Sequence, residues 1–510
     1  MLARVWSAAL VGIEAVKVGV EIDVAGGLPA VVIVGLPDTA VQESKERVRA
    51  ALRNAGYAFP MRRVVVNLTP ADLRKEGPSF DLPIGIGVLA ASEQVDPQLL
   101  GDFLFLGEVS LDGALRPVTG VLPIAAAAQK LGLIGLVVPL ANANEAAVVE
   151  GLRVYGFEHL SQVTAFLGNP NAHTPIQAIN AACQTEANKS YTLDLKDVKG
   201  QAHARRALEI AAAGGHNLIF VGPPGSGKTM LARRLPGILP PLDFSEALEV
   251  TKVHSVAGLL KNQGRLIRDR PFRSPHHSAS GPALVGGGSF PRPGEVSLAH
   301  RGILFLDELT EFKRDVLEFL RQPLEDGFVS VSRARQSVVF PAQFTLVAST
   351  NPCPCGYYAD PIQACTCTPR QRETYWAKLS GPLMDRIDLQ VAVSRLKPEE
   401  MTQGDLGEPS EVVRARVLAA RDLAQARFQA EPNLHCNAQI QSRHLRRWCQ
   451  LEDSTRQLLE SAITRLGLSA RATDRILKVA RTIADLAQAQ NLESAHVAEA
   501  IQYRTLDRWQ

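Results

Sequence analysis

The sequence has few cysteines, few aromatic residues and little net charge, so none of these three features indicates the class of the protein directly. Only seven of the 510 residues are cysteine, an odd number that argues against a disulfide framework and favours a reducing compartment. Aromatic residues make up 5%, too few for wide base-stacking platforms. The net charge of +3 is too small to indicate a partner, so any nucleic-acid surface must be local.

Long hydrophobic runs are also missing. No stretch approaches the ~20 uninterrupted apolar residues of a transmembrane helix, and Glu14 and Lys17 interrupt the apolar N-terminus, where a signal peptide needs a continuous core. We therefore expect a cytoplasmic protein without a membrane partner. With 46% hydrophobic and 21% charged residues the composition is globular, and a chain of 510 residues predicts roughly two to four domains.

Hydrophobic periodicity divides the chain into four parts. Residues 1–167 alternate β-rich and helical segments, which predicts an α/β or α+β domain. Residues 168–193 lose the periodicity and gather Asn, Pro, Thr and Ser, as a linker does. Residues 194–395 have the pattern of a second α/β domain, and residues 396–510 that of helices.

The clearest chemistry lies in "NLIFVGPPGSGKTMLARRL", where an apolar strand enters a glycine-rich loop and a helix leaves it. This is the setting of the G-x-x-x-x-G-K-T phosphate loop, although an ordinary glycine-rich turn is the alternative. Backbone N–H groups of such a loop converge on phosphate oxygens, Lys228 supplies a positive charge, and Thr229 offers a hydroxyl to Mg²⁺. The predicted nucleotide-binding residues are Gly222, Pro223, Pro224, Gly225, Ser226, Gly227, Lys228, Thr229 and, from the next motif, Asp307.

Two further strands end in polar residues. The apolar run "ILFL" delivers Asp307 and Glu308 at its C-terminal end, where ligands bind in parallel sheets. Asp307 is predicted to hold Mg²⁺ with Thr229, and Glu308 to polarise the attacking water; a solvated turn is the alternative. The strand "FTLVAST" ends in Asn351, whose amide can bind the water or the γ-phosphate.

Arg386 lies between two acids, Asp385 and Asp388, in "SGPLMDRIDLQV". It can form a surface salt bridge, or it can act as an arginine finger that reaches the nucleotide of a neighbouring subunit. Such an arginine can contribute on the order of a thousandfold to the rate of an NTPase.

These motifs together resemble those of the AAA+ ATPases. They match, in order, the Walker A, Walker B, sensor 1, arginine-finger and sensor 2 positions: Lys228, Asp307 with Glu308, Asn351, Arg386 and Arg471, with Arg475 as a competing sensor 2. Three longer strings, "PFRSPHHSASGPALVGGGSFPRPGEVSLAHRGILFLDEL", "NPCPCGYY" and "SGPLMDRIDL", are similar to the magnesium-chelatase-like branch. Over essentially the whole chain the sequence resembles the ComM/YifB family of bacterial competence proteins.

The resemblance implies a fold and an activity. The fold is an AAA+ P-loop parallel-sheet core with a C-terminal helical lid, preceded by a Lon-protease-like (ribosomal protein S5 domain 2-like) α+β domain. The activity is that of a homo-hexameric, ATP-hydrolysing motor on single-stranded or branched DNA, a helicase promoting branch migration during natural transformation. Its catalytic residues would be Glu308, Asn351, Arg386 and Arg471. The alternatives are a chelatase-like subunit that drives metal insertion into a porphyrin and an ATP-dependent protease.

Two segments are candidates for contact with DNA. "GFVSVSRARQSVVFPAQF" predicts a β-hairpin with Arg333 and Arg335 at its tip, where they can bind phosphates in a ring pore or lie solvated. "RPFRSPHHSASGPALVGGGSFPRPGE", between the Walker motifs, is rich in Gly, Pro, Ser and His and favours a mobile loop. Its His276 and His277 can be zinc ligands, phosphate donors or structural loop residues.

The N-terminal part carries a protease-like string without the matching base. "KEGPSFDLPIG" places Ser79 in the G-P-S context of the Lon serine–lysine proteases. The resemblance puts Pro123 where the partner lysine should be, and Lys130 lies about two helical turns further on. A serine hydroxyl is a poor nucleophile without a base, so we expect a Lon-like fold without peptidase activity.

Four of the seven cysteines lie between Cys353 and Cys367 in the pattern C-x-C-x₉-C-x-C. Four thiolates that converge are a common structural Zn²⁺ site, although C-x₂-C is the commoner spacing. A disulfide pair is the alternative, and a reducing compartment disfavours it. The predicted zinc ligands are Cys353, Cys355, Cys365 and Cys367, between Asn351 and Arg386.

Overall fold

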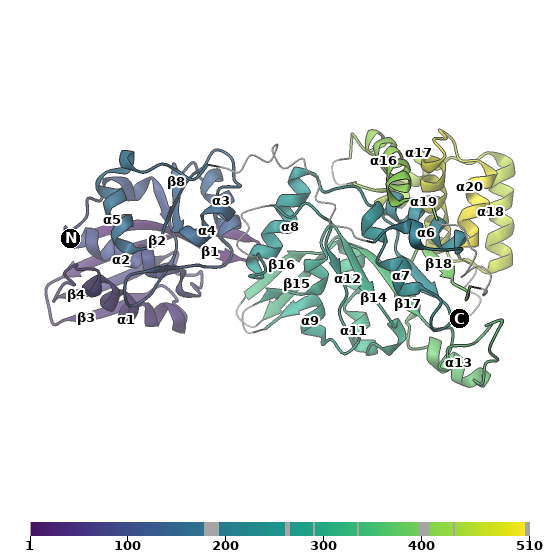
Figure 1. Cartoon of the computed structure of the whole chain (residues 1–510), viewed down its shortest axis with the longest axis horizontal. Helices are drawn as coiled ribbons and strands as arrows, with labels where there is room; N and C mark the ends of the chain where they lie inside the picture. The colour runs from purple at the N-terminus through teal and green to yellow at the C-terminus, as the bar shows by residue number, and fades with distance from the viewer. Residues whose placement is uncertain are drawn as a thin grey trace. The chain divides into compact units, whose positions relative to one another are not determined.

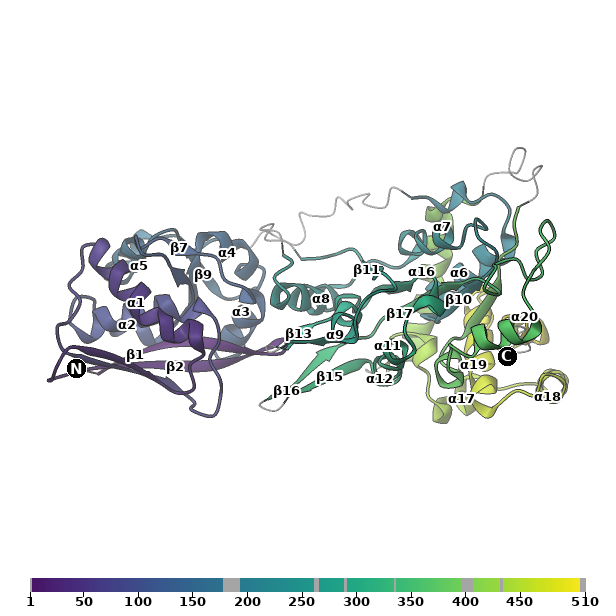
Figure 2. The same cartoon turned by 90° about the horizontal axis from the view of Figure 1, so that it is seen from below.

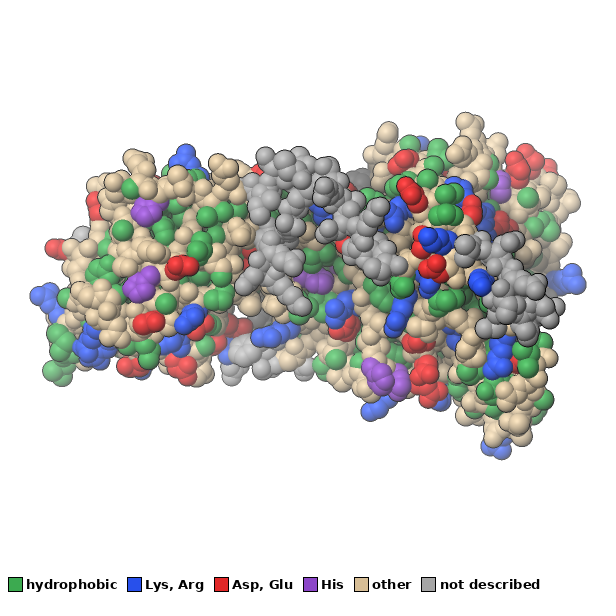
Figure 3. All heavy atoms as spheres, in the orientation of Figure 1, with side chains coloured by type: hydrophobic (Ala, Val, Ile, Leu, Met, Phe, Trp, Pro, Cys, Tyr) green, Lys and Arg blue, Asp and Glu red, His purple; other side chains and the backbone are tan. Residues whose placement is uncertain are grey.

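The computed structural model describes residues 2–177, 193–260, 266–288, 291–333, 336–396, 407–431 and 434–504. These residues belong to two compact units (Figure 1). The first unit comprises Met1–Ala187 with Phe244–Ile267, and the second comprises Asn188–Asp243 with Arg268–Gln510. On the face shown in Figure 3, basic and acidic side chains are interspersed, as the small net charge of +3 suggests. Within the described ranges, no helix is both long enough and apolar enough to cross a bilayer.

The first unit is built on a mixed seven-stranded sheet with strand order β3-β4-β2-β1-β5-β8-β9. The pairs β1–β2 and β2–β4 are antiparallel, and the other neighbours are parallel. Along β4, Val64, Val66 and Leu68 are buried and alternate with more exposed residues, as in a strand with one covered face. The strands are β1 (Leu2–Val11), β2 (Glu14–Ala25), β3 (Ala30–Val34), β4 (Arg63–Thr69), β5 (Phe103–Phe105), β8 (Gly135–Pro139) and β9 (Arg153–Phe157), beside the short pair β6 (Glu108–Val109) and β7 (Leu115–Arg116).

Helices of the first unit cover this sheet, and one of them comes from far along the chain. The helices are α1 (Thr39–Asn54), α2 (Asp81–Ala91), α3 (Val121–Lys130), α4 (Leu140–Ala146), α5 (Leu160–Gly168) and α8 (Phe244–Val256). In Figures 1 and 2, α8 lies beside α3. Its Leu248 packs against the core under α3, and Ser255 Oγ donates to the half-buried carboxylate of Glu145. A helix from between the two Walker motifs is thus part of the first unit.

The second unit contains a five-stranded parallel sheet with strand order β11-β14-β17-β10-β18. All four residues of β10 and of β14 are buried, because helices cover both faces of the sheet. The strands are β10 (Leu218–Val221), β11 (Phe272–Arg273), β14 (Ile303–Leu306), β17 (Thr345–Thr350) and β18 (Leu389–Ala392). The α-helices of this part of the chain are α6 (Ala202–Gly214), α7 (Lys228–Ala232), α9 (Gly281–Val285), α10 (Glu295–Leu298), α11 (Arg314–Glu318), α12 (Arg321–Asp326), α13 (Pro369–Trp376) and α14 (Gly381–Met384).

Two hairpins and a set of C-terminal helices complete the second unit. The hairpins are β12 (Gly286–Gly287) with β13 (Arg292–Pro293), and β15 (Phe328–Arg333) with β16 (Gln336–Pro341). The C-terminal helices are α16 (Ser410–Arg427), α17 (Ser442–Trp448), α18 (Asp453–Leu466), α19 (Ala470–Leu486) and α20 (Ser494–Gln502). Their apolar faces share one core with α6 and the sheet.

Candidate nucleotide site and cysteine cluster

The loop between β10 and α7 follows a path that its glycines permit. Gly225 and Gly227 have positive φ angles of 76° and 90°, which other residues rarely adopt. An added Cβ at Gly222 would lie 2.0 Å from the carbonyl oxygen of Val393, so the two backbones approach closely only because Gly222 has no side chain. Among the described residues, the buried Ser226 Oγ has no hydrogen-bond partner. A glycine-lined loop with an unpartnered buried hydroxyl fits phosphate oxygens.

Lys228 begins α7 and lies back across this loop. Its Nζ donates to the carbonyl oxygens of Gly222 (2.7 Å) and Pro223 (2.9 Å) and to Asn351 Oδ1 (3.2 Å). Burial lowers the pKa of Lys228 to about 8, and nearby carboxylates act in the opposite direction. The predicted phosphate-binding lysine and the predicted sensor 1 amide are therefore in direct contact.

Asp307, at the end of β14, receives hydroxyl hydrogen bonds from two other segments. Thr229 Oγ1, at the start of α7, donates to Asp307 Oδ2 at 2.8 Å. Ser349 Oγ, on β17, donates to Asp307 Oδ1. The hydroxyl and the carboxylate that the sequence predicts as Mg²⁺ ligands thus lie together, and both are the oxygen ligands that Mg²⁺ prefers.

Glu308 follows Asp307 in a left-handed backbone conformation, with φ of 54°. Its N–H donates to Asp307 Oδ1 at 3.1 Å, which turns the chain sharply after the strand. The side chain is 58% exposed, and its Oε2 lies 3.6 Å from Nδ1 of His277. The sequence does not predict this contact, because 30 residues of chain, including a glycine-rich segment, separate the two side chains.

Arg386 makes its contacts within its own chain in this structure. Its guanidinium forms an ion pair with Glu325 of α12 and donates to the Pro382 carbonyl oxygen at 2.6 Å. The side chain is 13% exposed. Asp388, one of the two flanking acids, is buried and pairs instead with Arg475. An arginine finger at this position would first have to leave Glu325.

The two sensor 2 candidates on α19 differ in their surroundings. Arg475 is bound to Asp388, whose pKa lies far below its usual range although burial opposes the shift, because Arg475 and His216 lie beside it. Arg471 is exposed and makes no hydrogen bond or ion pair with another residue that the structure describes. Arg471 is therefore the candidate that is available for a ligand.

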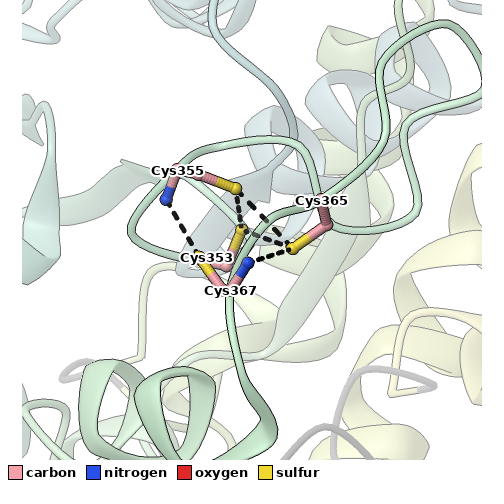
Figure 4. Close-up of side chains that lie close together, drawn as sticks. All are labelled: Cys353, Cys355, Cys365 and Cys367. Atoms are coloured by element: carbon pink, nitrogen blue, oxygen red, sulfur yellow. Dashed lines mark hydrogen bonds between the residues drawn. The ribbon is translucent and has the colours of Figure 1, made fainter.

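The four clustered cysteines face one another at short distances (Figure 4). Sγ of Cys353 lies 3.4 Å from that of Cys355 and 3.7 Å from that of Cys365, and the Cys355–Cys365 separation is 3.6 Å. All four sulfur atoms lie within 4.8 Å of one another. A tetrahedral Zn²⁺ with Zn–S bonds of about 2.3 Å needs S···S edges of about 3.8 Å, so this geometry fits a metal. A disulfide needs an S–S distance of about 2.05 Å, and none of these four cysteines is paired in a disulfide.

The cysteine loop also touches the phosphate loop. An added Cβ at Gly356 would lie 2.7 Å from Cδ of Pro224. Arg395 bridges the same two segments, since its guanidinium donates to the Pro224 carbonyl oxygen at 3.5 Å and lies 3.3 Å from the Asp360 carboxylate. The sequence predicts cysteines near the sensor 1 residue, but it does not predict this contact with the phosphate loop.

The predicted hairpin is present as β15 and β16, with Arg333 opposite Gln336 in the register. Arg335 and the side chain of Arg333 lie outside the described residues. The glycine-rich insert has more regular structure than its composition predicts. It supplies strand β11 to the sheet and buries Leu284 of α9, although it was expected to be a mobile loop.

Ser79 of the first unit lies in a short 3-10 turn, Pro78–Phe80. The structure shows no hydrogen bond from its hydroxyl to any residue in the described part of the chain. Pro123 is buried within α3, and Lys130 is exposed at the end of the same helix. Neither position supplies a base to Ser79.

Three family models match segments of this chain. The family described as "Magnesium chelatase, subunit ChlI" matches residues 194–401, which contain the nucleotide site. "Subunit ChlI of Mg-chelatase" matches residues 20–142, and "Magnesium chelatase, subunit ChlI C-terminal" matches residues 407–504.

Curated relatives match almost the full length. "Competence protein ComM" of Haemophilus influenzae is 47% identical over 99% of this chain and 98% of its own. "Uncharacterized protein YifB" of Escherichia coli is 44% identical, with the same coverage of 99% and 98%. By contrast, the "Magnesium-chelatase subunit ChlI" of Euglena gracilis is 26% identical over 26% of this chain and 45% of its own.

Proposed function

Because this chain belongs to the ComM/YifB family of AAA+ ATPases with magnesium-chelatase-type domains, we propose that it is an ATP-driven motor acting on single-stranded or branched DNA. ATP binding and hydrolysis are supported by four residues that lie at one edge of the sheet and are hydrogen-bonded in pairs: Lys228 with Asn351, and Thr229 with Asp307. The DNA half is supported by the name of the Haemophilus relative, a competence protein, and by the sequence of the hairpin tip.

Each residue of the nucleotide site has its own role in the proposed ATP hydrolysis. The phosphate loop and Lys228 bind the β- and γ-phosphates, and Asn351 fixes the γ-phosphate or the attacking water. Thr229 and Asp307 would hold Mg²⁺, which neutralises phosphate charge when it is bound. Glu308 accepts a hydrogen bond from the attacking water and polarises it.

Two arginines support a nucleotide site at a subunit boundary. We propose a homo-hexamer in which Arg386 leaves Glu325 and stabilises the developing charge on the nucleotide of the adjacent subunit. Arg471, on the first turn of α19, would approach the nucleotide from the C-terminal helices of its own subunit. The Lon-like origin of the first unit, without peptidase activity, is part of the same proposal.

The four cysteines are proposed to hold one structural Zn²⁺. Their S···S separations of 3.4, 3.6 and 3.7 Å support a closed tetrahedron, which leaves no open position for chemistry. Bound metal would fix the loop that contacts Pro224 and so would support the shape of the phosphate loop. The cluster acts here through structure and not through catalysis.

The test of the motor is ATP hydrolysis with and without forked DNA, together with strand displacement. We expect DNA to raise turnover. Replacing Arg333 and Arg335 together by alanine should leave basal hydrolysis intact but reduce DNA stimulation and strand displacement, and the salt dependence of DNA binding should flatten by about one unit of slope per lost phosphate contact. The control is Arg446→Ala with Arg447→Ala, which removes the same charge from α17.

Unchanged strand displacement in the hairpin variant would remove these arginines from DNA contact. If DNA had no effect on the wild-type chain, while a porphyrin-chelating partner stimulated it, the chelatase alternative would replace the motor. Cleavage of protein substrates would instead favour the Lon-like protease.

A further inference from the structure

The phenol of Tyr375 connects two segments of the nucleotide site, although none of the predicted ATPase motifs includes it. Thr310 Oγ1, in the short turn after Glu308, donates to Tyr375 Oη at 2.5 Å. The hydroxyl of Thr350, the last residue of β17, lies 3.1 Å from Thr310 Oγ1 and 3.4 Å from Tyr375 Oη. Three hydroxyls from three parts of the chain thus form one closed hydrogen-bonded group, the hydroxyl cluster.

The hydroxyl cluster is buried. The two threonines are each 1% exposed, and Tyr375 is 6% exposed. Hydrogen bonds are stronger in such surroundings than in water, and a hydroxyl left unpaired there is costly. Burial also raises the pKa of Tyr375 above its usual range, so the phenol keeps its proton at neutral pH. The cluster is therefore a fixed link and not a solvated surface contact.

This link lies beyond the point where β14 and β17 stop pairing. Their parallel register ends with Leu306 opposite Ala348. Past this point the backbone ladder no longer fixes the spacing of the two segments. One segment carries Glu308 two residues before its threonine, and the other carries Asn351 directly after its threonine. The hydroxyl cluster thus joins the segment of the predicted water-polarising carboxylate to that of the predicted sensor 1 amide.

Helix α13 holds Tyr375 through contacts of its own. Trp376 Nε1, the next residue along the helix, donates to the Pro352 carbonyl oxygen at 3.1 Å. Just after the helix, Lys378 Nζ donates to the Thr310 carbonyl oxygen at 3.2 Å and lies 5.6 Å from the centre of the Tyr375 ring. The helix is therefore fixed to both segments, and the phenol is the group that reaches between them.

We propose that Tyr375 is a positioning residue that keeps Glu308 and Asn351 at the spacing that ATP hydrolysis needs. It acts through Thr310 and Thr350 and not by touching the reacting atoms. Such geometry matters for the chemical step, because a displacement of about 1 Å can cost about a hundredfold in rate. The inference rests on the proposed function only in that the chain hydrolyses ATP.

The experiment measures steady-state ATP hydrolysis and binding of a fluorescent ATP analogue by full-length variants. Tyr375→Phe removes one oxygen and keeps the ring. We expect kcat to fall about five- to tenfold, while KM and the Kd of the analogue stay within about twofold of wild type, because the phosphate loop is untouched. Thr350→Val, which removes a second hydroxyl of the cluster, should lower kcat similarly. The double variant should fall no further than the slower single variant, since either change already opens the cluster.

Tyr57→Phe is the matched control. The Tyr57 hydroxyl lies 2.5 Å from Thr164 Oγ1 in the first unit, so this variant loses a phenol–threonine hydrogen bond of the same length in the other unit. It should keep the kcat of the wild type. An equal fall of kcat in the control would mean that general loosening of the chain, and not the spacing of two segments, lowers the rate, and it would overturn the proposal.

Other results also decide the matter. An unchanged kcat in Tyr375→Phe would overturn the proposal, as would a rise in KM alone, which would assign the phenol to nucleotide binding. Falls that multiply in the double variant would show that the two hydroxyls act separately, and would overturn the joined cluster. If Tyr375→Phe did not fold, Thr350→Val would take its place, and a wild-type kcat there would overturn the proposal.

The same measurements separate this inference from the DNA motor. If DNA did not stimulate a wild type that hydrolyses ATP, the motor would fail, yet a lowered kcat in Tyr375→Phe would still support the positioning role. A wild type without ATP hydrolysis would overturn both.

Discussion

Each of the two units contains a sequence motif typical of a catalytic site, but only in the second unit does the structure bring the expected partner residues to the motif. In the second unit the string supplies Lys228 and Thr229, and two distant strand ends supply their partners, Asn351 and Asp307. In the first unit Ser79 lies in its protease-like string, while the position expected for its base is the buried Pro123. A local motif alone therefore does not make a catalytic site, because the chemistry depends on the partner residue that the sheet brings to it.

The comparison of the two units can be tested further, because we propose that the site of the second unit needs an arginine from an adjacent subunit. Arg386→Ala should lower ATP turnover about a thousandfold or more, because the transition-state charge loses its cation, while nucleotide binding persists. Mixing this variant with Lys228→Ala should restore part of the activity, since an intact arginine and an intact phosphate loop meet at mixed interfaces. Turnover of each variant and of mixtures is the measurement.

Recovery in the mixture is what separates an arginine finger from the in-chain ion pair with Glu325. Glu325→Gln is the control, because it breaks that pair and keeps the arginine. Mixed rings that form but never recover activity would assign Arg386 to the salt bridge alone.

Glu308→Gln tests whether the site's base is as indispensable as its cation. We expect turnover to fall about a hundredfold or more, since an amide cannot take the proton of the attacking water. Binding of ATP should be retained, because Lys228, Thr229 and Asp307 are unchanged. A fluorescent nucleotide titration beside steady-state turnover checks both, and near-wild-type turnover would remove Glu308 from this role.

The sequence predicts that the residues of the candidate nucleotide site lie together, because its motifs follow the ends of short apolar strands. The strands before Gly222 and Asp307 have the bounds that the apolar runs predict, 218–221 and 303–306. Buried parallel strands are continuous apolar runs, and their C-terminal ends meet at one edge. Topology alone then brings Thr229, Asp307 and Asn351 together.

Contacts between loops could not be predicted in this way. The approach of Gly356 to Pro224 and of His277 to Glu308 depends on loop paths, for which the sequence has no periodic signal. The docking of α8 in the first unit was missed for another reason. Its apolar residues show only that it packs against something, and the partner, the core under α3, lies more than a hundred residues earlier in the chain.

Removing the metal should have a smaller effect on the second unit than removing a catalytic group. Wild-type protein prepared without chelators should contain about one Zn²⁺ per chain by elemental analysis. Cys365→Ser with Cys367→Ser should lose it, because two thiolates cannot close a tetrahedron. Turnover and ring assembly should weaken several-fold through the contact with Pro224, while the global fold persists, since the cluster is one loop of a large unit.

Cys436→Ser with Cys449→Ser is the control, because both thiols are buried outside the cluster. A wild-type chain without stoichiometric metal would contradict the zinc site. If the variant loses metal without any change in assembly or turnover, the zinc site is supported, but its proposed effect on the nucleotide loop is contradicted.

We expect the smallest effect from a change in the protease-like motif of the first unit, which contains Ser79 but no base for it. Ser79→Ala should change neither ATP turnover nor thermal stability, because its hydroxyl has no hydrogen-bond partner among the described residues and no base. Ser255→Ala is the matched comparison in the same unit: it deletes the donor to Glu145, a carboxylate whose pKa burial already raises. We expect it to lower stability by about 1–2 kcal/mol, a shift of a few degrees in the first thermal transition, with turnover retained. Calorimetry of both variants checks this, and a loss of turnover or stability in Ser79→Ala alone would show that the protease-like string still has a function.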